Sequence, residues 1–179
     1  MNPVASVAPS MPAAATPQDL EARVWAALAG VQDPEIPVLS VVDLGVIRHV
    51  HADAQGKLEV GLAPTYSGCP ATEVIRASVL EALCEALATD VAVVEVLSPP
   101  WTSDWISDRG RERLEHYGIA PPARSVGSPR ELGRAEPARR CPRCGSDATS
   151  EVSRFGSTPC KALHRCNECL EPFEYFKCI

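Results

Sequence analysis

Apolar residues recur with helical spacing directly after the first sixteen positions of the chain. Thr16 suits the N-cap of such a helix, Pro17 suits its first turn and Asp19 its third position, while Gly30 suits its end. The residues that would share one face of this helix are Leu20, Val24, Ala27 and Leu28. The pattern therefore predicts an amphipathic first helix that packs on one side.

Two runs of strand-like alternation come next, with a tight turn between them. Val46–His51 and Lys57–Ala63 alternate well enough for strands, and Asp53–Gly56 has the composition of a hairpin turn. Glu73–Ala88 shows helical periodicity, and Val91–Leu97 is an almost continuous apolar run. A strand–helix–strand connection makes its two strands parallel. The order α-β-β-α-β therefore predicts an α+β fold with a small mixed sheet.

Composition divides the chain into four segments. Residues 1–16 are rich in Ala, Pro and Ser and predict a disordered N-terminal tail. Residues 17–119 form the α+β domain, which closes with a helix ending near Tyr117. Residues 120–139 combine prolines and arginines without periodicity and predict a linker. Residues 140–179 are too few to fold on a hydrophobic core alone, so we expect a metal to stabilise this second domain.

The net charge of −6 disfavours a nucleic-acid partner, and the acidic residues concentrate in the first domain. No run of about 18 apolar residues occurs, so no membrane-spanning helix is expected. The N-terminal segment lacks the basic and apolar regions of a signal peptide. We therefore expect a cytoplasmic protein whose eight cysteines are reduced. In that compartment metal binding explains paired cysteines better than disulfides do.

The second domain carries two C-x-x-C pairs, a pattern typical of a tetrahedral structural zinc site. The four predicted metal ligands are Cys141, Cys144, Cys166 and Cys169. The few apolar residues available to support them are Phe155, Leu163, Phe173, Tyr175 and Phe176. Cys160 and Cys178 lie outside both pairs and are candidates for additional ligands. Because of these two extra cysteines, an iron–sulfur cluster is the alternative to zinc in this domain. Iron–sulfur clusters and zinc are bound by the same kind of thiolate ligands.

Cys69 lies in the other notable stretch, Thr65–Ala71, between the second predicted strand and the second predicted helix. The N-terminus of a helix favours a thiolate through its dipole and its unpaired N–H groups. Gly68 allows the sharp bend that this junction needs. A small buried cysteine after a turn is the alternative interpretation.

Three ordered motifs resemble the SufT/MIP-type iron–sulfur assembly domain. They are Asp33-Pro-Glu-Ile-Pro, Val42-Asp-Leu-Gly-Val-Ile47 and Thr65-x-x-x-Cys69-Pro70, and they span about residues 17–117. The resemblance implies that Cys69 is the functional thiol of the domain. It also implies neighbouring motif roles for Asp33, Glu35, Asp43 and Thr65.

The tryptophan-rich segment from Trp101 to Ile106 and the end of the chain, Glu171-Pro-Phe-x-Tyr-Phe-Lys-Cys178, narrow the resemblance. Together they resemble the PaaD (also called PaaJ) family, the small subunits of bacterial phenylacetyl-CoA epoxidase systems. This resemblance implies an accessory role in aerobic phenylacetate degradation. Such a subunit would mature or insert the iron or iron–sulfur centres of the oxygenase and reductase subunits, holding iron or a cluster transiently at Cys69.

The chain shows no motif for catalysis of its own. No Glu-x-x-His pair for a di-iron centre and no glycine-rich nucleotide loop occurs, so no catalytic residue is predicted. An iron–sulfur electron-transfer subunit of the same oxygenase complex is the alternative function. A nucleic-acid-binding ribbon is a third hypothesis, which the acidic first domain disfavours. We expect the oxygenase and reductase subunits of the epoxidase system as partners, and we expect no association with a membrane. A homodimer is a further possibility.

Overall fold

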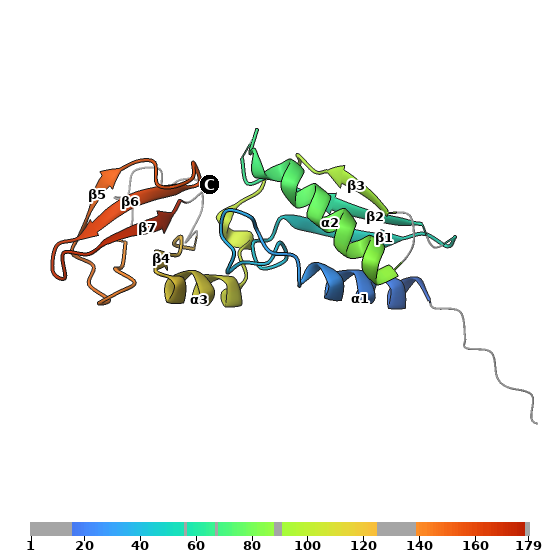
Figure 1. Ribbon diagram of the computed structural model, residues 1–179, viewed down its shortest axis with the longest axis horizontal. Helices are drawn as coiled ribbons and strands as arrows, with labels where there is room; N and C mark the ends of the chain where they lie inside the picture. Colours follow the sequence, from blue (N-terminus) through green and yellow to red (C-terminus); the bar gives the residue numbers. More distant parts are fainter. Residues whose placement is uncertain (1–15, 56, 67, 88–90, 125–138, 178–179) are drawn as a thin grey trace, which may run out of the picture.

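In the computed structural model, residues 16–177 are described except for 56, 67, 88–90 and 125–138 (Figure 1). Residues 1–15 of the tail predicted at 1–16, the greater part of the predicted linker and Cys178 therefore lie outside the described residues. Helix α1 (Pro17–Leu28) begins as the sequence predicts. The Thr16 hydroxyl accepts the N–H of Asp19 at 3.2 Å, and the Asp19 carboxylate accepts the N–H of Thr16 at 3.1 Å, which completes a capping box.

The first sheet has three strands in the order β1-β2-β3. Strands β1 (Ile47–Ala52) and β2 (Leu58–Leu62) are antiparallel, and β3 (Val91–Glu95) runs parallel to β2 after helix α2 (Ala71–Leu87). Helices α1 and α2 lie side by side along the sheet in Figure 1. The predicted order α-β-β-α-β and the mixed sheet are confirmed. One core is formed by buried residues of these elements: Val24, Leu28, Leu58, Val60, Leu62, Ile75, Val79 and Leu83.

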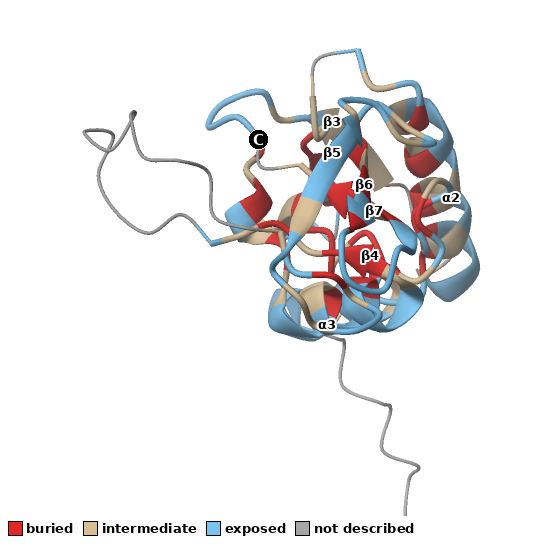
Figure 2. Cartoon of the chain, turned by 90° about the vertical axis from the view of Figure 1, so that its left-hand side faces the viewer, coloured by how far each residue is buried: buried red, intermediate tan, exposed pale blue. Residues whose placement is uncertain are grey.

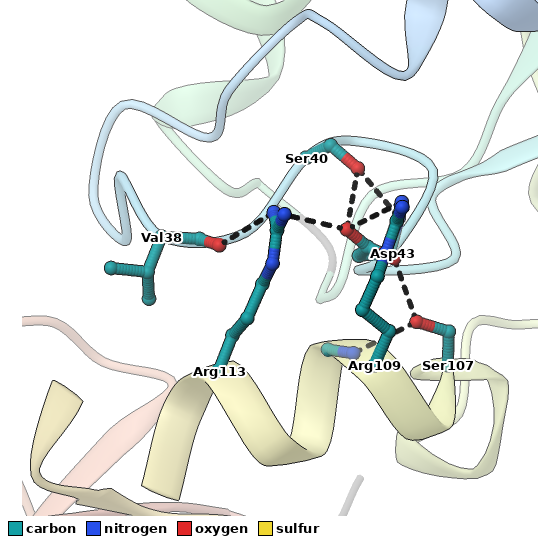
Figure 3. Close-up of polar contacts among 7 residues, drawn as sticks. Val38, Ser40, Asp43, Ser107, Arg109 and Arg113 are labelled. Atoms are coloured by element: carbon teal, nitrogen blue, oxygen red, sulfur yellow. Dashed lines mark hydrogen bonds and ion pairs between the residues drawn. The ribbon is translucent and has the colours of Figure 1, made fainter. Parts of the chain in front are cut away.

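A buried carboxylate ties the loop between α1 and β1 to helix α3 (Asp108–Tyr117), as Figure 3 shows. Asp43 is 2% exposed. Its Oδ1 accepts hydrogen bonds from Ser107 Oγ at 2.8 Å and Arg109 Nε at 3.0 Å. Its Oδ2 accepts from Ser40 Oγ at 2.9 Å and Arg109 Nη2 at 3.0 Å, and Arg113 lies 3.5 Å away. Every oxygen of the buried charge is therefore satisfied, as a buried charge requires.

The second sheet has the order β4-β7-β6-β5. Strand β4 (Ile119–Ala120) follows α3 directly and pairs in parallel with β7 (Pro172–Phe176). Strand β6 (Lys161–Cys166) lies between β7 and β5 (Thr149–Ser153), with antiparallel pairing on both sides. The end of the first predicted domain is thus a strand of the second domain's sheet. Figure 2 shows buried residues in β6 and β7, whereas β5 is largely exposed.

The two domains share part of their cores. Phe176 of β7 and Cys160 before β6 belong to the buried cluster of the first domain. The Phe176 ring lies 6.1 Å from the ring of Trp101, whose Nε1 donates to the carbonyl of Leu44 at 3.1 Å. Phe155, expected in the core of the second domain, is instead 67% exposed. No helix within the described residues is long and apolar enough to cross a membrane.

Replacing Phe176 with Ala should loosen the contact between the domains. Removing a buried phenylalanine ring costs about 3–5 kcal/mol because it leaves a cavity. We expect a loss of that size in the free energy of unfolding, measured by urea denaturation of the whole chain. Phe155→Ala is the matched control, since that ring is exposed, and it should change stability by less than about 1 kcal/mol. Equal losses for both variants would contradict the shared core.

Asp43→Asn should remove a pH-dependent part of the stability. Burial raises the pKa of Asp43, but hydrogen bonds from Arg109, Ser107 and Ser40 outweigh this effect and lower the pKa. The ionised carboxylate therefore stabilises the fold above its unfolded pKa of about 3.9, and this contribution is lost as pH falls through the folded pKa.

At neutral pH, Asp43→Asn should lower the free energy of unfolding by about 1.5–3 kcal/mol, the usual contribution of a hydrogen bond to a charged group. The difference from wild type should shrink below about pH 4, where wild type itself loses the contribution. Urea titrations at several pH values measure both effects. Glu115→Gln, on an exposed position of α3, should behave as wild type. A deficit that is the same at every pH would refute the assignment of the charge.

Candidate metal and thiol sites

Four cysteines of the second domain gather at one end of its sheet. Cys141 Sγ lies 3.8 Å from Cys169 Sγ, and Cys144 Sγ lies 3.6 Å from Cys166 Sγ. A metal with tetrahedral Zn–S bonds of about 2.3 Å places its sulfurs about 3.8 Å apart. The spacing fits a single tetrahedral ion. Among the described residues this is the one group of three or more Cys, His, Asp or Glu whose ligand atoms all lie within 4.8 Å.

The backbone around these cysteines favours thiolates. Gly145, with φ of 76°, lets the first C-x-x-C turn close, and its N–H donates to the carbonyl of Cys141 at 2.8 Å. Hydrogen bonds from the backbone N–H groups of Cys169 and Glu168, together with those from neighbouring thiols, lower the pKa of Cys166 to about 6. Although a hydrogen bond from a backbone N–H opposes the shift, burial and neighbouring thiols raise the pKa of Cys169 to about 12, so one proton is shared unequally within the group. The two turns thus supply the donor set and the N–H groups of a thiolate metal site.

Cys69 lies on the wall of a small cavity between the two domains. Side chains from five separate stretches of the chain line this cavity. Four of the five residues predicted to form the functional site line it, namely Asp33, Glu35, Thr65 and Cys69. The other lining residues include Ile36, Leu44, Ile75, Cys160 and Phe176, which are buried in the core of the first domain. The volume in which the centre of a water molecule fits inside the cavity is about 20 Å³. A single water needs roughly 10–15 Å³ by this measure, so the cavity holds one small body.

The local backbone places Cys69 directly before α2. Gly68 adopts φ of 81°, which the sequence predicts from the sharp bend, and the N–H of Cys69 donates to the carbonyl of Tyr66 at 3.2 Å. The carbonyl of Cys69 accepts the N–H of Thr72 at 3.1 Å in the first turn of the helix. Cys69 is partly buried and is not disulfide-bonded. The thiol is therefore held at a helix start and faces a confined space.

Asp33 contributes a carboxylate that is only partly used by the backbone. Its Oδ1 accepts the N–H groups of Glu35 at 2.9 Å and Ile36 at 2.8 Å, which fixes the Asp-Pro-Glu turn. Asp33 is 6% exposed, and no hydrogen bond to its Oδ2 is found among the described residues. Burial raises the pKa of Asp33, although hydrogen bonds from the backbone N–H groups of Ile36 and Glu35 act in the other direction. The pKa of Glu35 is raised first by burial and second by the nearby charge of Asp33.

Cys160 comes from the second domain but faces the first. It is 5% exposed, its Sγ lies 3.1 Å from Thr158 Oγ1, and burial raises the pKa of its thiol. The neighbouring Lys161 is buried and pairs with Glu174 at 2.9 Å. Tyr66 lies near the same groups, and burial together with Cys69 raises its pKa to about 12. Its buried hydroxyl has no nitrogen or oxygen partner in the part of the chain that the structure describes.

The structure therefore groups the predicted site residues in two places. Asp33, Glu35, Thr65 and Cys69 share the cavity, whereas Asp43 lies in the network that ties the loop to α3. Cys160, considered as a further ligand for the metal of the second domain, lies outside its four-cysteine group and lines the cavity. Cys178 lies outside the described residues. Lys161 and Tyr66 were not expected, and no sequence pattern marks them, because their positions follow from the contact between domains.

Two family models match the chain in tandem. Residues 21–96 match the model described as iron-sulfur cluster assembly protein, and residues 125–177 match the PaaD zinc beta ribbon domain. A crystal structure of a domain of unknown function (DUF59) from Bacillus anthracis has 27% sequence identity and a TM-score of 0.52. That match covers 55% of this chain and 93% of the other. Fold and sites thus define a protein with an iron–sulfur assembly domain followed by a zinc-ribbon domain.

A relative that spans both domains defines the family. An Escherichia coli K12 protein, named as the D subunit of a "Putative 1,2-phenylacetyl-CoA epoxidase", is 49% identical over 157 residues, which is 88% of this chain and 92% of that protein. The chain belongs to this family, PaaD. The Bacillus subtilis protein named Fe-S protein maturation auxiliary factor YitW is 35% identical over 89 residues, 49% of this chain and 86% of that protein.

Cys141→Ser should remove the metal of the second domain and the order of its sheet together. Metal binding and folding are one equilibrium in so small a domain. We expect loss of the bound ion by elemental analysis and rapid hydrogen exchange in β6 and β7. Cys84→Ser, at an exposed position of α2, is the control and should keep both. Full metal content in Cys141→Ser would rule out the four-thiolate site.

Proposed function

We propose that this chain is an accessory factor of a phenylacetyl-CoA epoxidase system. In this role it receives iron or a preformed iron–sulfur cluster at Cys69 and passes it to the oxygenase or reductase subunit. The observation that carries the proposal is the cavity in which Cys69 meets Asp33 and Glu35 within an iron–sulfur assembly domain. The epoxidase-subunit relative and the maturation-factor relative support an accessory role of this kind.

The donor set of the cavity suits transfer better than storage. Thiolate and carboxylate are both ligands for iron, and the thiolate also binds iron–sulfur clusters. Asp33, Glu35 and Cys69 do not bring their ligand atoms into one tight group, in contrast to the four cysteines of the second domain. An ion bound to Cys69 therefore keeps coordination positions free for a ligand of the receiving protein. Cys69 binds the cargo in this scheme, and the carboxylates balance its charge.

The second domain has a structural role in this proposal, with zinc as its ion. Four sulfurs 3.6–3.8 Å apart in pairs fit one tetrahedral ion, whereas the inorganic sulfides of a cluster would hold the cysteines further apart. The alternative of a permanent cluster for electron transfer is disfavoured for this reason. Elemental analysis of protein purified without oxygen should give about one zinc per chain. A brown protein that bleaches with dithionite would favour the electron-transfer alternative.

Cys69→Ser should abolish the delivery of iron without unfolding the protein. We expect the oxygenase and reductase, produced together with this variant, to contain as little iron as when the whole chain is omitted. Iron content of the purified partners measures this effect, and the zinc content of the variant reports on its folding. Cys84→Ser serves as control, since it changes a cysteine at an exposed position of α2. Normal iron content in partners matured with Cys69→Ser would count decisively against the proposal.

A further inference from the structure

Cys160 lies outside the four-cysteine group, yet it is one of the three buried cysteines among the described residues. It is 5% exposed and packs in the core of the first domain, although the chain reaches it between β5 and β6 of the second. It lines the same cavity as Cys69. Two cysteines from different domains thus line one small cavity of about 20 Å³. Neither forms a disulfide.

The other groups around this space point to a cation as its occupant. Asp33 is more than nine-tenths buried and lines the cavity, and its Oδ2 accepts no hydrogen bond from the described residues. Glu35 lines the same wall. Lys161, the buried cation adjacent to Cys160, is already paired with Glu174 at 2.9 Å. The charge of Lys161 also acts on Asp33, Glu35 and Cys160. Two thiols and two carboxylates around one space nevertheless offer more anionic ligands than this one ammonium group balances, and a divalent metal ion suits such a donor set.

We propose that Cys69 and Cys160 form a pair of thiolate ligands for one soft divalent cation, with Fe(II) as the cargo and Asp33 as the nearby carboxylate. This inference rests on the proposed function and gives its site a second thiol from the zinc-ribbon domain. The volume of the cavity, about 20 Å³, suits a single ion. On binding, two metal–sulfur bonds form and two thiol protons leave to water, with no change in oxidation state.

The pairing makes delivery depend on contact between the domains. Lys177 N–H donates to the carbonyl of Cys160 at 3.0 Å, next to Phe176, so the position of Cys160 follows that of β7. Movement of the second domain away from the first would withdraw one of the two thiolates and weaken the hold on the ion. A receiving protein that separates the domains would thereby collect the cargo.

Cobalt is the probe for this site because Co(II) resembles Fe(II) and Zn(II) in ligand preference and absorbs visible light when bound to thiolates. The full chain, with zinc in the second domain, is titrated with Co(II) under reducing, anaerobic conditions. Native mass spectrometry should show one cobalt in addition to one zinc. Cobalt-edge X-ray absorption should then count two sulfur neighbours, since zinc occupies the other thiolates. This count needs no variant.

Cys69→Ser and Cys160→Ser should each weaken cobalt binding at least about tenfold, whereas Cys84→Ser should bind as wild type. No bound cobalt, or a cobalt with a single sulfur neighbour and unchanged binding by Cys160→Ser, would overturn the pairing.

The two proposals fail differently. If only the pairing is wrong, Cys160→Ser binds cobalt as wild type does, but Cys69→Ser still fails to deliver iron. If the proposed function is wrong, the partners of Cys69→Ser contain normal amounts of iron.

Discussion

The carboxylate of Asp43 carries a buried negative charge that Arg109, Ser107 and Ser40 surround with hydrogen bonds. A buried charge of this kind tolerates few alternative geometries, because each lost partner leaves it unsatisfied. Asp43 lies in the loop that also carries Asp33, and Arg109 lies in the first turn of α3. The network therefore fixes one wall of the cavity relative to the helix that leads to the second domain.

Helix α3 connects this network to the second sheet through a short segment of chain. Gly118 caps the C-terminal end of the helix with φ of 95° and turns the chain, and β4 then pairs directly with β7. Strand β7 places Phe176 against Trp101. Two paired residues of β4 contribute little stability alone, so the apolar contact of Phe176 supplies the rest. Asp43 and Phe176 thus act at the two ends of one connection, and the cavity lies between them.

The elements of the first domain were predictable because each has a local signal: a capping box at Thr16, alternation in β1 and β2, and glycine at a bend such as Gly68. The four-cysteine site has one too. The contact between domains has none. Ile119 and Ala120 are too few residues to show a strand periodicity. The aromatic residues of the second domain, such as Phe155 and Phe176, have no sequence pattern that separates buried from exposed positions. Nothing local shows that Phe155 is exposed while Phe176 enters the other core.

The two sites differ in what their ligand spacing allows, and the difference couples them. Four close thiolates enclose an ion and stabilise the fold of the second domain, as structural zinc does. The thiols and carboxylates of the cavity do not form a tight group of this kind, so an ion bound there would stay exchangeable. Cys160 precedes β6, and β6 ends at Cys166, a ligand of the first site. A metal that orders β6 at one end therefore orders Cys160 at the other. In the proposed scheme, an ion bound by the four cysteines would thereby set the geometry of the second site.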